Sequence, residues 1–376
     1  MGSDDIRSVY ARGTSSDDIL RTLTSELDGV APKLIVLFAG HRRDGAGLTG
    51  ALSARYSGAT VVGCTTAGEF TESSTGVDGV SALGLGAGVV KRVGAAIARC
   101  DKGVDVAVRG ALDRISAQLG QPLREADPAR YVGLTFIDGL HMHEEEVNEE
   151  LGNGAPLMSF VGGSAGDDCE FERTRVFLNG EEADEGAVLA VIESAVPFVV
   201  EKTCCFESTG RVLVVTKADP ANRVVYEFDG GDAVAAYAEA VGVPRDRLDA
   251  SVFMVSPVGL MIDGAPWIRS PQRVMPDGGL RFYCRIEQGM EVHLMRSTDL
   301  VQGTRQSMDE ARKKLGGSVR GGLAFNCILR RLEMDAKRLH AGFLSSFEGM
   351  KVAGFHTYGE SWLGHINQTL TGLWFK

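Results

Sequence analysis

The chain has 376 residues, 44% of them hydrophobic and 24% charged, with a formal net charge of −11. This length exceeds what one ordinary core holds, so we expect two domains, and the composition is that of a soluble globular protein. The acidic charge argues against nucleic acid and anionic membranes as partners, and no apolar run reaches the ~18 residues of a membrane span.

The N-terminal residues and the cysteine pattern indicate in which cellular compartment the protein is located. The first residues, MGSDDIRSVYARG, lack the apolar region of a secretion signal, and the seven cysteines form no Cys-x-x-Cys pair. We therefore expect reduced thiols and a cytoplasmic location.

The first third of the chain alternates helices and strands. Residues 15–28 have the apolar spacing of a capped helix, and LIVLFAG at 34–40 is an apolar run typical of a buried strand. The elements expected next are a short helix at 47–56, a strand at 59–70, two strands around a glycine turn at 79–100 and an amphipathic helix at 104–120.

The same order restarts in the middle of the chain. It comprises a strand at 131–139, a short helix at 143–152, a strand at 156–168 and a hairpin at 173–194 with its turn at 179–182. A third copy closes the chain, with strands at 321–329, 350–360 and 365–375 and a helix at 334–348. The sequence thus predicts an α/β (α+β) fold of mixed β-sheets flanked by helices, built from repeated strand–helix–strand–strand units.

The copies share a glycine skeleton. It reads Gly-x-x-Thr-x-Gly-Glu at residues 63–69 and again at 354–360, and residues 156–168 hold a form one residue shorter. Glycines in strands mark bends or places where another backbone comes close, so the skeleton marks a repeated structural position.

A different region separates the second and third copies. The turn signal at 219–222 (Asp-Pro-Ala-Asn) leads us to place a boundary near residue 219, which gives domains 1–219 and 220–376. The expected elements there are a strand and a helix within 216–242, strands at 251–262, 266–275, 279–286 and 291–296, and a helix at 299–316.

Several motifs in this order resemble the FIST family. They are VYEFDG at 225–230, Phe325-Asn326-Cys327 with Arg330, GFHTYGE at 354–360 and NQTL at 367–370, while 63–69 and 162–168 resemble the N-terminal domain of that family. The resemblance implies an intracellular sensory protein that binds a small ligand and signals to an output module. Some stand-alone members resemble haem-carrying nitric oxide sensors that act on histidine kinases.

No output segment follows the last strand of this sequence. We therefore expect output in trans, to a separate protein such as a histidine kinase or a cyclic-di-nucleotide signalling protein.

The terminal hairpin is the main candidate site. Thr357, Tyr358, Glu360, His365 and Asn367 are expected to line a ligand pocket together with Arg330, because His365 and Asn367 share one face of a strand. Glu360 and Arg330 would meet the charged ends of an amino-acid-like ligand. The alternative is that these side chains only brace a corner of the sheet.

Three further residues carry alternatives. Two interpretations of Cys327 are open. It is either a nucleophile with His356 or His365 as its base, or a small buried hydrophobe, which is the interpretation that we favour. Arg330 binds a ligand carboxylate or pairs with Glu333. Arg269 follows Trp267 at strand spacing, so it contacts a ligand or stacks on that ring.

Histidines decide whether haem is a candidate cofactor. On a helix His141 and His143 point too far apart to share one metal, and the three glutamates that follow suit a helix start. If haem binds, the axial ligand is expected among His141, His143, His356 and His365. No Cys-x-x-Cys-His motif is present, so covalent c-type haem is excluded.

The leading hypothesis is a cytoplasmic small-molecule sensor without catalytic activity and with no cofactor certain. The phosphate-loop, Gly-x-Ser-x-Gly and His-Glu-x-x-His motifs are absent. The alternatives are a haem-based nitric oxide sensor that regulates a histidine kinase and an enzyme that depends on Cys327.

Overall fold

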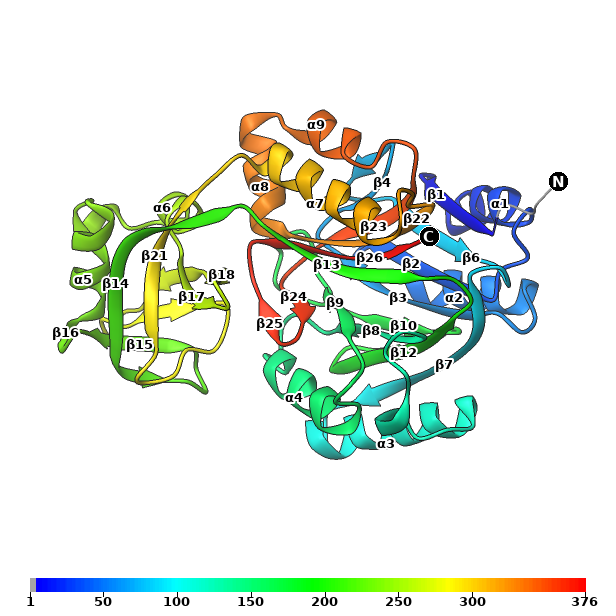
Figure 1. Cartoon of the computed structure of the whole chain (residues 1–376), viewed down its shortest axis with the longest axis horizontal. Helices are drawn as coiled ribbons and strands as arrows, with labels where there is room; N and C mark the ends of the chain where they lie inside the picture. Colours follow the sequence, from blue (N-terminus) through cyan, green and yellow to red (C-terminus); the bar gives the residue numbers. More distant parts are fainter. Residues whose placement is uncertain (1–4) are drawn as a thin grey trace.

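The computed structural model describes residues 5–376, which form a large body and a smaller lobe (Figure 1). Within these residues the body contains three six-stranded sheets and the lobe contains a fourth sheet. No helix in this range is long and apolar enough to cross a membrane.

The body consists of three units with one order of elements, namely an edge strand, a helix, a strand, a second helical segment, another strand, a short hairpin and a return strand. The first unit comprises β1 (Ile6–Ala11), α1 (Ser16–Leu27), β2 (Leu34–Gly40), α2 (Gly45–Arg55), β3 (Thr60–Thr66), β4 (Glu69–Thr71), β5 (Thr75–Gly76) and β6 (Val80–Leu85). The second comprises β7 (Val90–Arg99), α3 (Val104–Leu119), β8 (Tyr131–Ile137), α4 (Glu144–Gly154), β9 (Phe160–Ser164), β10 (Val176–Leu178), β11 (Glu181–Ala183) and β12 (Gly186–Ser194). The third comprises β13 (Phe198–Cys204), α7 (Leu300–Lys314), β22 (Gly321–Cys327), α8 (Ile328–Lys337), α9 (His340–Ser345), β23 (Lys351–Thr357), β24 (Glu360–Trp362), β25 (His365–Ile366) and β26 (Thr369–Phe375).

Each unit is built on one parallel pair of strands, β2 with β3, β8 with β9 and β22 with β23. A helical segment connects the two strands of each pair, as a parallel connection requires. The predicted repeat and the α+β class with mixed sheets are therefore confirmed.

The shared glycines lie where the two parallel strands come closest. A Cβ on Gly63 would lie 1.8 Å from the carbonyl oxygen of Leu37, and one on Gly162 would lie 1.8 Å from that of Thr135. At Gly354 the corresponding distance, to the carbonyl oxygen of Ala324, is 2.4 Å. The skeleton thus marks one position in all three units, where a side chain has no room.

The hairpins are exchanged cyclically among the units. Hairpin β4–β5 of the first unit pairs with β23 of the third, β10–β11 of the second pairs with β3 of the first, and β24–β25 of the third pairs with β9 of the second. Each unit therefore completes the sheet of another, so the three form one folded body.

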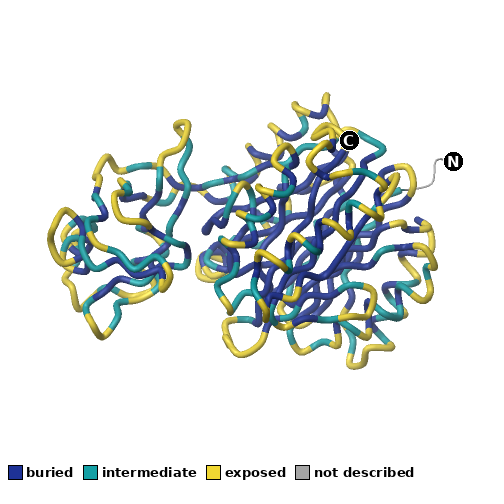
Figure 2. Tube along the Cα trace, turned by 90° about the horizontal axis from the view of Figure 1, so that it is seen from below, coloured by how far each residue is buried: buried dark blue, intermediate teal, exposed yellow. Residues whose placement is uncertain are grey.

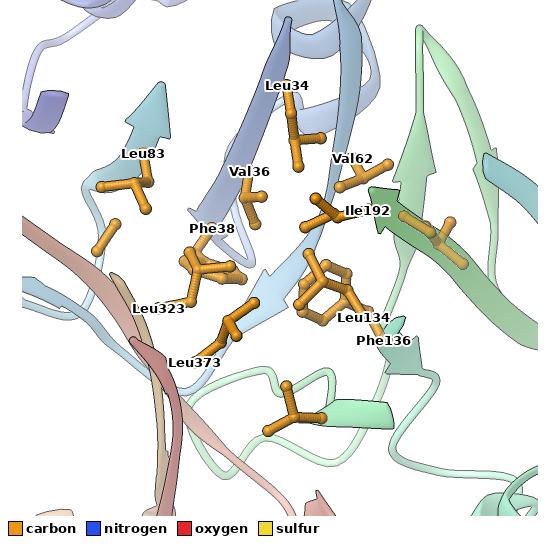
Figure 3. Close-up of a cluster of buried hydrophobic side chains, with 14 of the residues drawn as sticks. Leu34, Val36, Phe38, Val62, Leu83, Leu134, Phe136, Ile192, Leu323 and Leu373 are labelled. Carbon is orange, nitrogen blue, oxygen red and sulfur yellow. The ribbon is translucent and has the colours of Figure 1, made fainter. Parts of the chain in front are cut away.

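One hydrophobic core lies between the three sheets (Figure 3). Phe38, Phe136 and Phe325 come from β2, β8 and β22, and their ring centroids lie 5.5, 5.9 and 6.1 Å apart. Because the predicted second domain supplies Phe325, residues 321–376 share a core with the first two units.

The lobe is inserted into the third unit between β13 and α7 (Figure 1). It comprises β14 (Phe206–Asp219), β15 (Val224–Phe228), β16 (Gly231–Asp232), α5 (Ala233–Val241), α6 (Ala250–Val255), β17 (Val258–Ile262), β18 (Ala265–Arg269), β19 (Pro271–Val274), β20 (Leu280–Phe282) and β21 (Glu291–Ser297). It has its own buried core, and Figure 2 shows dark blue, buried segments within the lobe, apart from those of the body. The boundary that we expected near residue 219 falls inside this lobe, at the end of β14.

One predicted strand of the lobe is partly wrong. Residues 251–262 were expected to be extended, but α6 occupies the first half of this range. The side chain of Asp249 accepts hydrogen bonds from the backbone N–H groups of Ser251 and Val252. The apolar residues that follow are compatible with a strand or a helix, and this N-cap favours the helix.

Candidate functional site

A cleft of about 520 Å³ lies between the body and the lobe, and we call it the interlobe cleft. The body contributes the segment before α4 and the first residue of α4, the segment after β9, the first turns of α8 and Tyr358, while the lobe contributes β19, β20 and Arg223, which precedes β15. The lining residues are Gly139, Leu140, Met142, Glu144, Cys169, Phe171, Arg223, Gln272, Arg273, Arg281, Phe282, Tyr283, Ile328, Leu329, Leu332 and Tyr358.

The body side of the cleft is apolar and partly open to solvent. Phe171 is 54% exposed and Leu332 is 38% exposed, although both are large hydrophobic residues. The ring of Phe171 stacks on Tyr358, with centroids 5.1 Å apart. Exposed apolar side chains that line a concave surface are typical of a ligand site.

Tyr358 is held in place by the segment that follows β9. Its hydroxyl donates to Asp167 Oδ1 and accepts a hydrogen bond of 2.7 Å from the backbone N–H of Cys169. Burial and the contact with Asp167 raise the pKa of Tyr358, so the hydroxyl stays protonated. The aromatic wall is therefore fixed before any ligand arrives.

Four non-glycine residues that line the cleft have left-handed backbone conformations. Met142, Cys169, Phe171 and Arg223 line it and have φ angles of 58°, 67°, 54° and 56°. Non-glycine residues adopt this left-handed region at an energetic cost that the surrounding structure must offset, and such residues cluster at functional sites.

Arg223 joins the two sides at the base of the cleft. Its guanidinium donates to Glu144 Oε2 at 2.7 Å and to Glu145 Oε2, and both Arg223 and Glu144 are buried. Burial would raise the pKa of Glu144, but Arg223 and His365 outweigh it and lower that pKa to about 2. This charge network connects α4 of the body to the residue that precedes β15 of the lobe.

Two further arginines of the lobe face the cleft without such partners. Arg273 and Arg281 lie directly opposite each other on the antiparallel strands β19 and β20, next to an irregularity in the strand register. The Nη2 of Arg281 donates to Met142 Sδ at 3.3 Å, and no carboxylate within residues 5–376 forms an ion pair with either arginine. Burial, together with the charges of Arg273 and Arg223, lowers the pKa of Arg281.

The terminal hairpin contacts the lobe rather than forming one pocket of its own. Asn367 Oδ1 accepts from Cys284 Sγ at 2.7 Å, and Gln368 Oε1 accepts from Ser270 Oγ at 2.7 Å. The ring Nε2 of His365 lies 3.3 Å from the carbonyl oxygen of Tyr283. These polar side chains hold the lobe against the body.

The predicted site residues are thus divided among different places. Tyr358 lines the interlobe cleft, while His365 and Arg269 line a second hollow of about 320 Å³ between the lobe and α4. Thr357 is fully buried, and its Oγ1 lies 2.8 and 2.7 Å from the carbonyl oxygens of Ser164 and Gly359, which share its one hydroxyl hydrogen. The strand expected over 365–375 is interrupted at Gln368, whose φ is 54°, so His365 and Asn367 do not continue one regular strand face with Thr369.

Glu360 has the environment of a brace. It is fully buried, and its Oε2 accepts from the backbone N–H and the hydroxyl of Thr369 at 2.9 and 2.6 Å. In the first unit Glu69 takes the equivalent place and accepts from the backbone N–H of Gly79 at 2.6 Å. The glutamate that ends the repeated skeleton thus forms hydrogen bonds with the backbone at the start of the return strand.

Arg330 is buried on the side of α8 away from the cleft. It donates to Asn326 Oδ1 at 2.8 Å, to Cys205 Sγ at 3.1 Å and to Thr304 Oγ1 at 3.0 Å. The alternative of surface pairing with Glu333 is wrong, because Arg330 is only 2% exposed and Glu333 pairs with Lys337. Arg330 instead connects α8 to α7 and to the strand connection that leads into the lobe.

Two other expectations concern Cys327 and Arg269. Burial raises the pKa of the Cys327 thiol well above its usual value, which agrees with the favoured interpretation of a small buried hydrophobe. The expected stack of Arg269 on Trp267 is wrong. Trp267 instead stacks on Trp362 of the hairpin, with centroids 5.6 Å apart, and Lys202 lies 4.1 Å from the Trp267 ring.

None of the four candidate histidines lines the interlobe cleft. His141 and His143 precede α4 as expected, and their ring nitrogens contact Asp138 at 2.7 Å and Glu185 at 3.2 Å. His356 and His365 are buried, and residues 5–376 contain no group of three or more metal-ligating side chains. These surroundings do not fit a haem at the cleft, because no imidazole is aimed into it.

The sequence analysis missed the arginines of the cleft and Phe171. Arg273 and Arg281 are separated by a turn whose length alone does not reveal that they face each other. Two like charges that face each other across neighbouring strands would have indicated the site. Such a pair can be recognised only when the register of the two strands is known.

Comparison with protein families gives two matches that follow one another along the chain. The model described as the FIST N domain matches residues 33–231, and the model described as the FIST C domain matches residues 233–362. A search of curated proteins found no match.

Proposed function

Because the chain belongs to the FIST family, whose domains are small-ligand sensors of signal transduction, we propose that it binds its ligand in the interlobe cleft. The observation that carries the proposal is the composition of this cleft. Exposed apolar side chains of the body face arginines of the lobe that have no carboxylate partner in the described structure.

The connection between body and lobe suits a sensor. The chain enters the lobe at Phe206 and leaves it at Ser297, and these two residues are opposite each other in one antiparallel pair. A ligand that touches both walls binds best when the lobe is closed, so it shifts the population toward that position. The role is binding without catalysis.

We further propose that a separate cytoplasmic protein reads the position of the lobe. The sensor role of the family supports the need for an output. The predicted partner is a histidine kinase or a cyclic-di-nucleotide signalling protein.

A thermal-shift screen with a library of small metabolites tests the site. We expect hits that raise the melting temperature of the wild type and do so less for Leu332→Lys, which places a charge on the apolar wall of the cleft. Val106→Lys is the matched control, because Val106 is 70% exposed on α3 and lies outside the cleft. Equal shifts in wild type and Leu332→Lys for every hit would place the ligand elsewhere.

The same screen includes haemin, which addresses the alternative of a haem-based nitric oxide sensor. Haem bound through an imidazole gives a strong absorption band near the violet edge. A band lost in one of the single alanine variants of His141, His143, His356 or His365 would support that alternative against the proposal.

A further inference from the structure

We propose that the ligand of the interlobe cleft is an organic carboxylate with a flat apolar body, and that Arg273 and Arg281 bind its carboxylate group. This inference rests on the proposed function and adds the chemical class of the ligand.

The two arginines form an arrangement that is unfavourable without an anion. They are directly opposite each other on neighbouring strands, and like charges in this position destabilise a sheet. Apart from the contact of Arg281 with Met142 Sδ, neither guanidinium has a hydrogen bond to another side chain in residues 5–376. An anion between them would remove the repulsion and use their free donors.

Arg223 shows how the same cleft treats an arginine with a structural role. Its guanidinium is buried, its Nη2 pairs with Glu144 and Glu145, and its Nη1 donates to the carbonyl oxygen of Tyr283 at 2.7 Å. Arg273, in contrast, is exposed, and Arg281 is half-buried at the mouth of the cleft. The chain therefore neutralises one cleft arginine with its own carboxylates and leaves the other two for a group from outside.

The shape of a guanidinium favours a carboxylate. Its planar fork of N–H donors matches the two oxygens of a carboxylate, and such charge-assisted pairs are about twice as strong as neutral hydrogen bonds. The whole chain carries a net charge of −11, so an anion gains nothing from the overall field and needs this local positive pair.

The wall opposite the arginines determines the rest of the ligand. Phe171 and Leu332 are exposed apolar side chains of that wall, and the ring of Phe171 is held there by its stack on Tyr358, so a flat ring of the ligand has an aromatic face to contact. A volume of about 520 Å³ accommodates a small molecule with one ring. The charged group would meet the lobe and the ring would meet the body, so one ligand contacts both.

Three probes of matched shape test the assignment: phenylacetate, phenylacetamide and phenyl phosphate. We expect phenylacetate to bind the wild type at least tenfold more tightly than phenylacetamide, because charge-assisted hydrogen bonds exceed neutral ones by about 1.4 kcal/mol or more. In the double variant Arg273→Gln/Arg281→Gln this preference should disappear, because the affinity for phenylacetate should fall much more than the affinity for phenylacetamide. Arg211→Gln, an exposed arginine of the lobe outside the cleft, is the matched control and should retain the preference.

Cys169 provides a second readout at the site. It is exposed in the cleft, whereas Cys64, Cys100, Cys205, Cys284 and Cys327 are buried. Phenylacetate should slow the alkylation of Cys169 in the wild type and not in the double variant, with Cys169→Ser identifying the labelled position.

Several results would overturn the assignment. They are equal affinity for phenylacetate and phenylacetamide, a preference that persists in the double variant, tighter binding of phenyl phosphate, or no binding of phenylacetate. If phenylacetamide binds and Leu332→Lys abolishes this, the cleft is still the ligand site and only the carboxylate assignment fails. If Leu332→Lys changes the binding of no probe, the proposed function fails as well.

The ligand-free protein gives a test that separates binding from folding. Removing one of two facing like charges should raise the melting temperature of Arg281→Gln above that of the wild type. A lower melting temperature would show that Arg281 supports the fold and would contradict the proposal. Arg273→Gln removes the exposed member of the same pair, so its melting temperature should change in the same direction.

Discussion

At the scale of single residues, Glu360 is a carboxyl group whose protonation is coupled to folding. It is fully buried, its Oε1 has no hydrogen-bond partner, and burial raises its pKa to about 8, although Thr369 and His365 act in the opposite direction. The ionisable groups that act on Glu360 are His365, whose pKa is raised to about 9, and the thiol of Cys327. Neutral Glu360 is thus the form that the fold favours.

This raised pKa predicts a pH-dependent effect of Glu360→Gln. The folded protein holds the proton up to a pKa of about 8, while the unfolded chain releases it near pH 4.3, so the wild type loses stability as the pH rises between these values. Glutamine keeps an oxygen for Thr369 and does not ionise. We expect the variant to be the more stable one at pH 8, by up to about 5 kcal/mol, and similar to the wild type at pH 4.

Denaturant unfolding from pH 4 to pH 9 measures this difference. The exposed Glu310→Gln serves as the control and should follow the wild type. A stability difference for Glu360→Gln that does not change with pH would show that the buried carboxyl group does not titrate as described.

At the scale of elements, the parallel strand pairs depend on glycines that have no room for a side chain. Gly63→Ala would place a Cβ against the backbone of Leu37, so β2 and β3 would have to move apart. We expect a loss of about 1–3 kcal/mol or more, measured by chemical unfolding. Gly152→Ala in α4 is the matched control, because nothing lies within 4 Å of the added Cβ.

The control should stabilise the protein by about 0.5–1 kcal/mol, because alanine favours a helix more than glycine does. Unchanged stability of Gly63→Ala would mean that the two strands adjust at no cost, and the repeated glycine would then need another explanation.

The hairpin β24–β25 is the element that connects the second unit, the third unit and the lobe. Trp362 of this hairpin stacks on Trp267 of the lobe with the rings 14° apart, and Lys202 lies 5.7 Å from the Trp362 ring. We expect Trp362→Ala to weaken the attachment of the lobe by about 1 kcal/mol and to speed proteolytic cleavage near residues 204–206 and 297–300.

The neighbouring Leu363→Ala should leave the cleavage rate unchanged, because Leu363 is 69% exposed and makes no such stack. Equal cleavage of wild type and Trp362→Ala would show that the remaining contacts, those of His365, Asn367 and Gln368, suffice to hold the lobe.

At the scale of the whole molecule, the body is closed by the cyclic exchange of hairpins and the lobe is an insertion into one unit. We therefore predict that a chain in which a short Gly-Ser linker replaces residues 206–297 still folds. The linker has a short distance to span, because Phe206 and Ser297 are cross-strand neighbours and the N–H of Thr298 donates to the carbonyl oxygen of Cys205 at 2.8 Å.

Circular dichroism should show a cooperative thermal transition for this shortened chain, and the probes of the interlobe cleft should no longer bind. An unfolded product would contradict the prediction and show that the body requires the lobe. The intact chain, measured in parallel, is the reference for both results.

The sequence by itself determined the repeated units and the places where their strands meet. Apolar runs such as 34–40 and 131–137 specify buried strands, and glycines such as Gly63 and Gly162 specify close parallel pairing, because both are local properties of the chain. The family motifs are likewise contiguous stretches, and the FIST models match the chain accordingly.

Only the tertiary structure decided which unit receives each hairpin, that the lobe interrupts the third unit, and that Arg273 faces Arg281. The polar residues of the terminal hairpin show the reason. From sequence they predict a pocket or a brace equally well, because the same donors and acceptors serve a ligand, a neighbouring sheet or a second lobe. Their partners, such as Cys284 for Asn367 and Ser270 for Gln368, lie 83 and 98 residues away along the chain, and only folding brings them into contact.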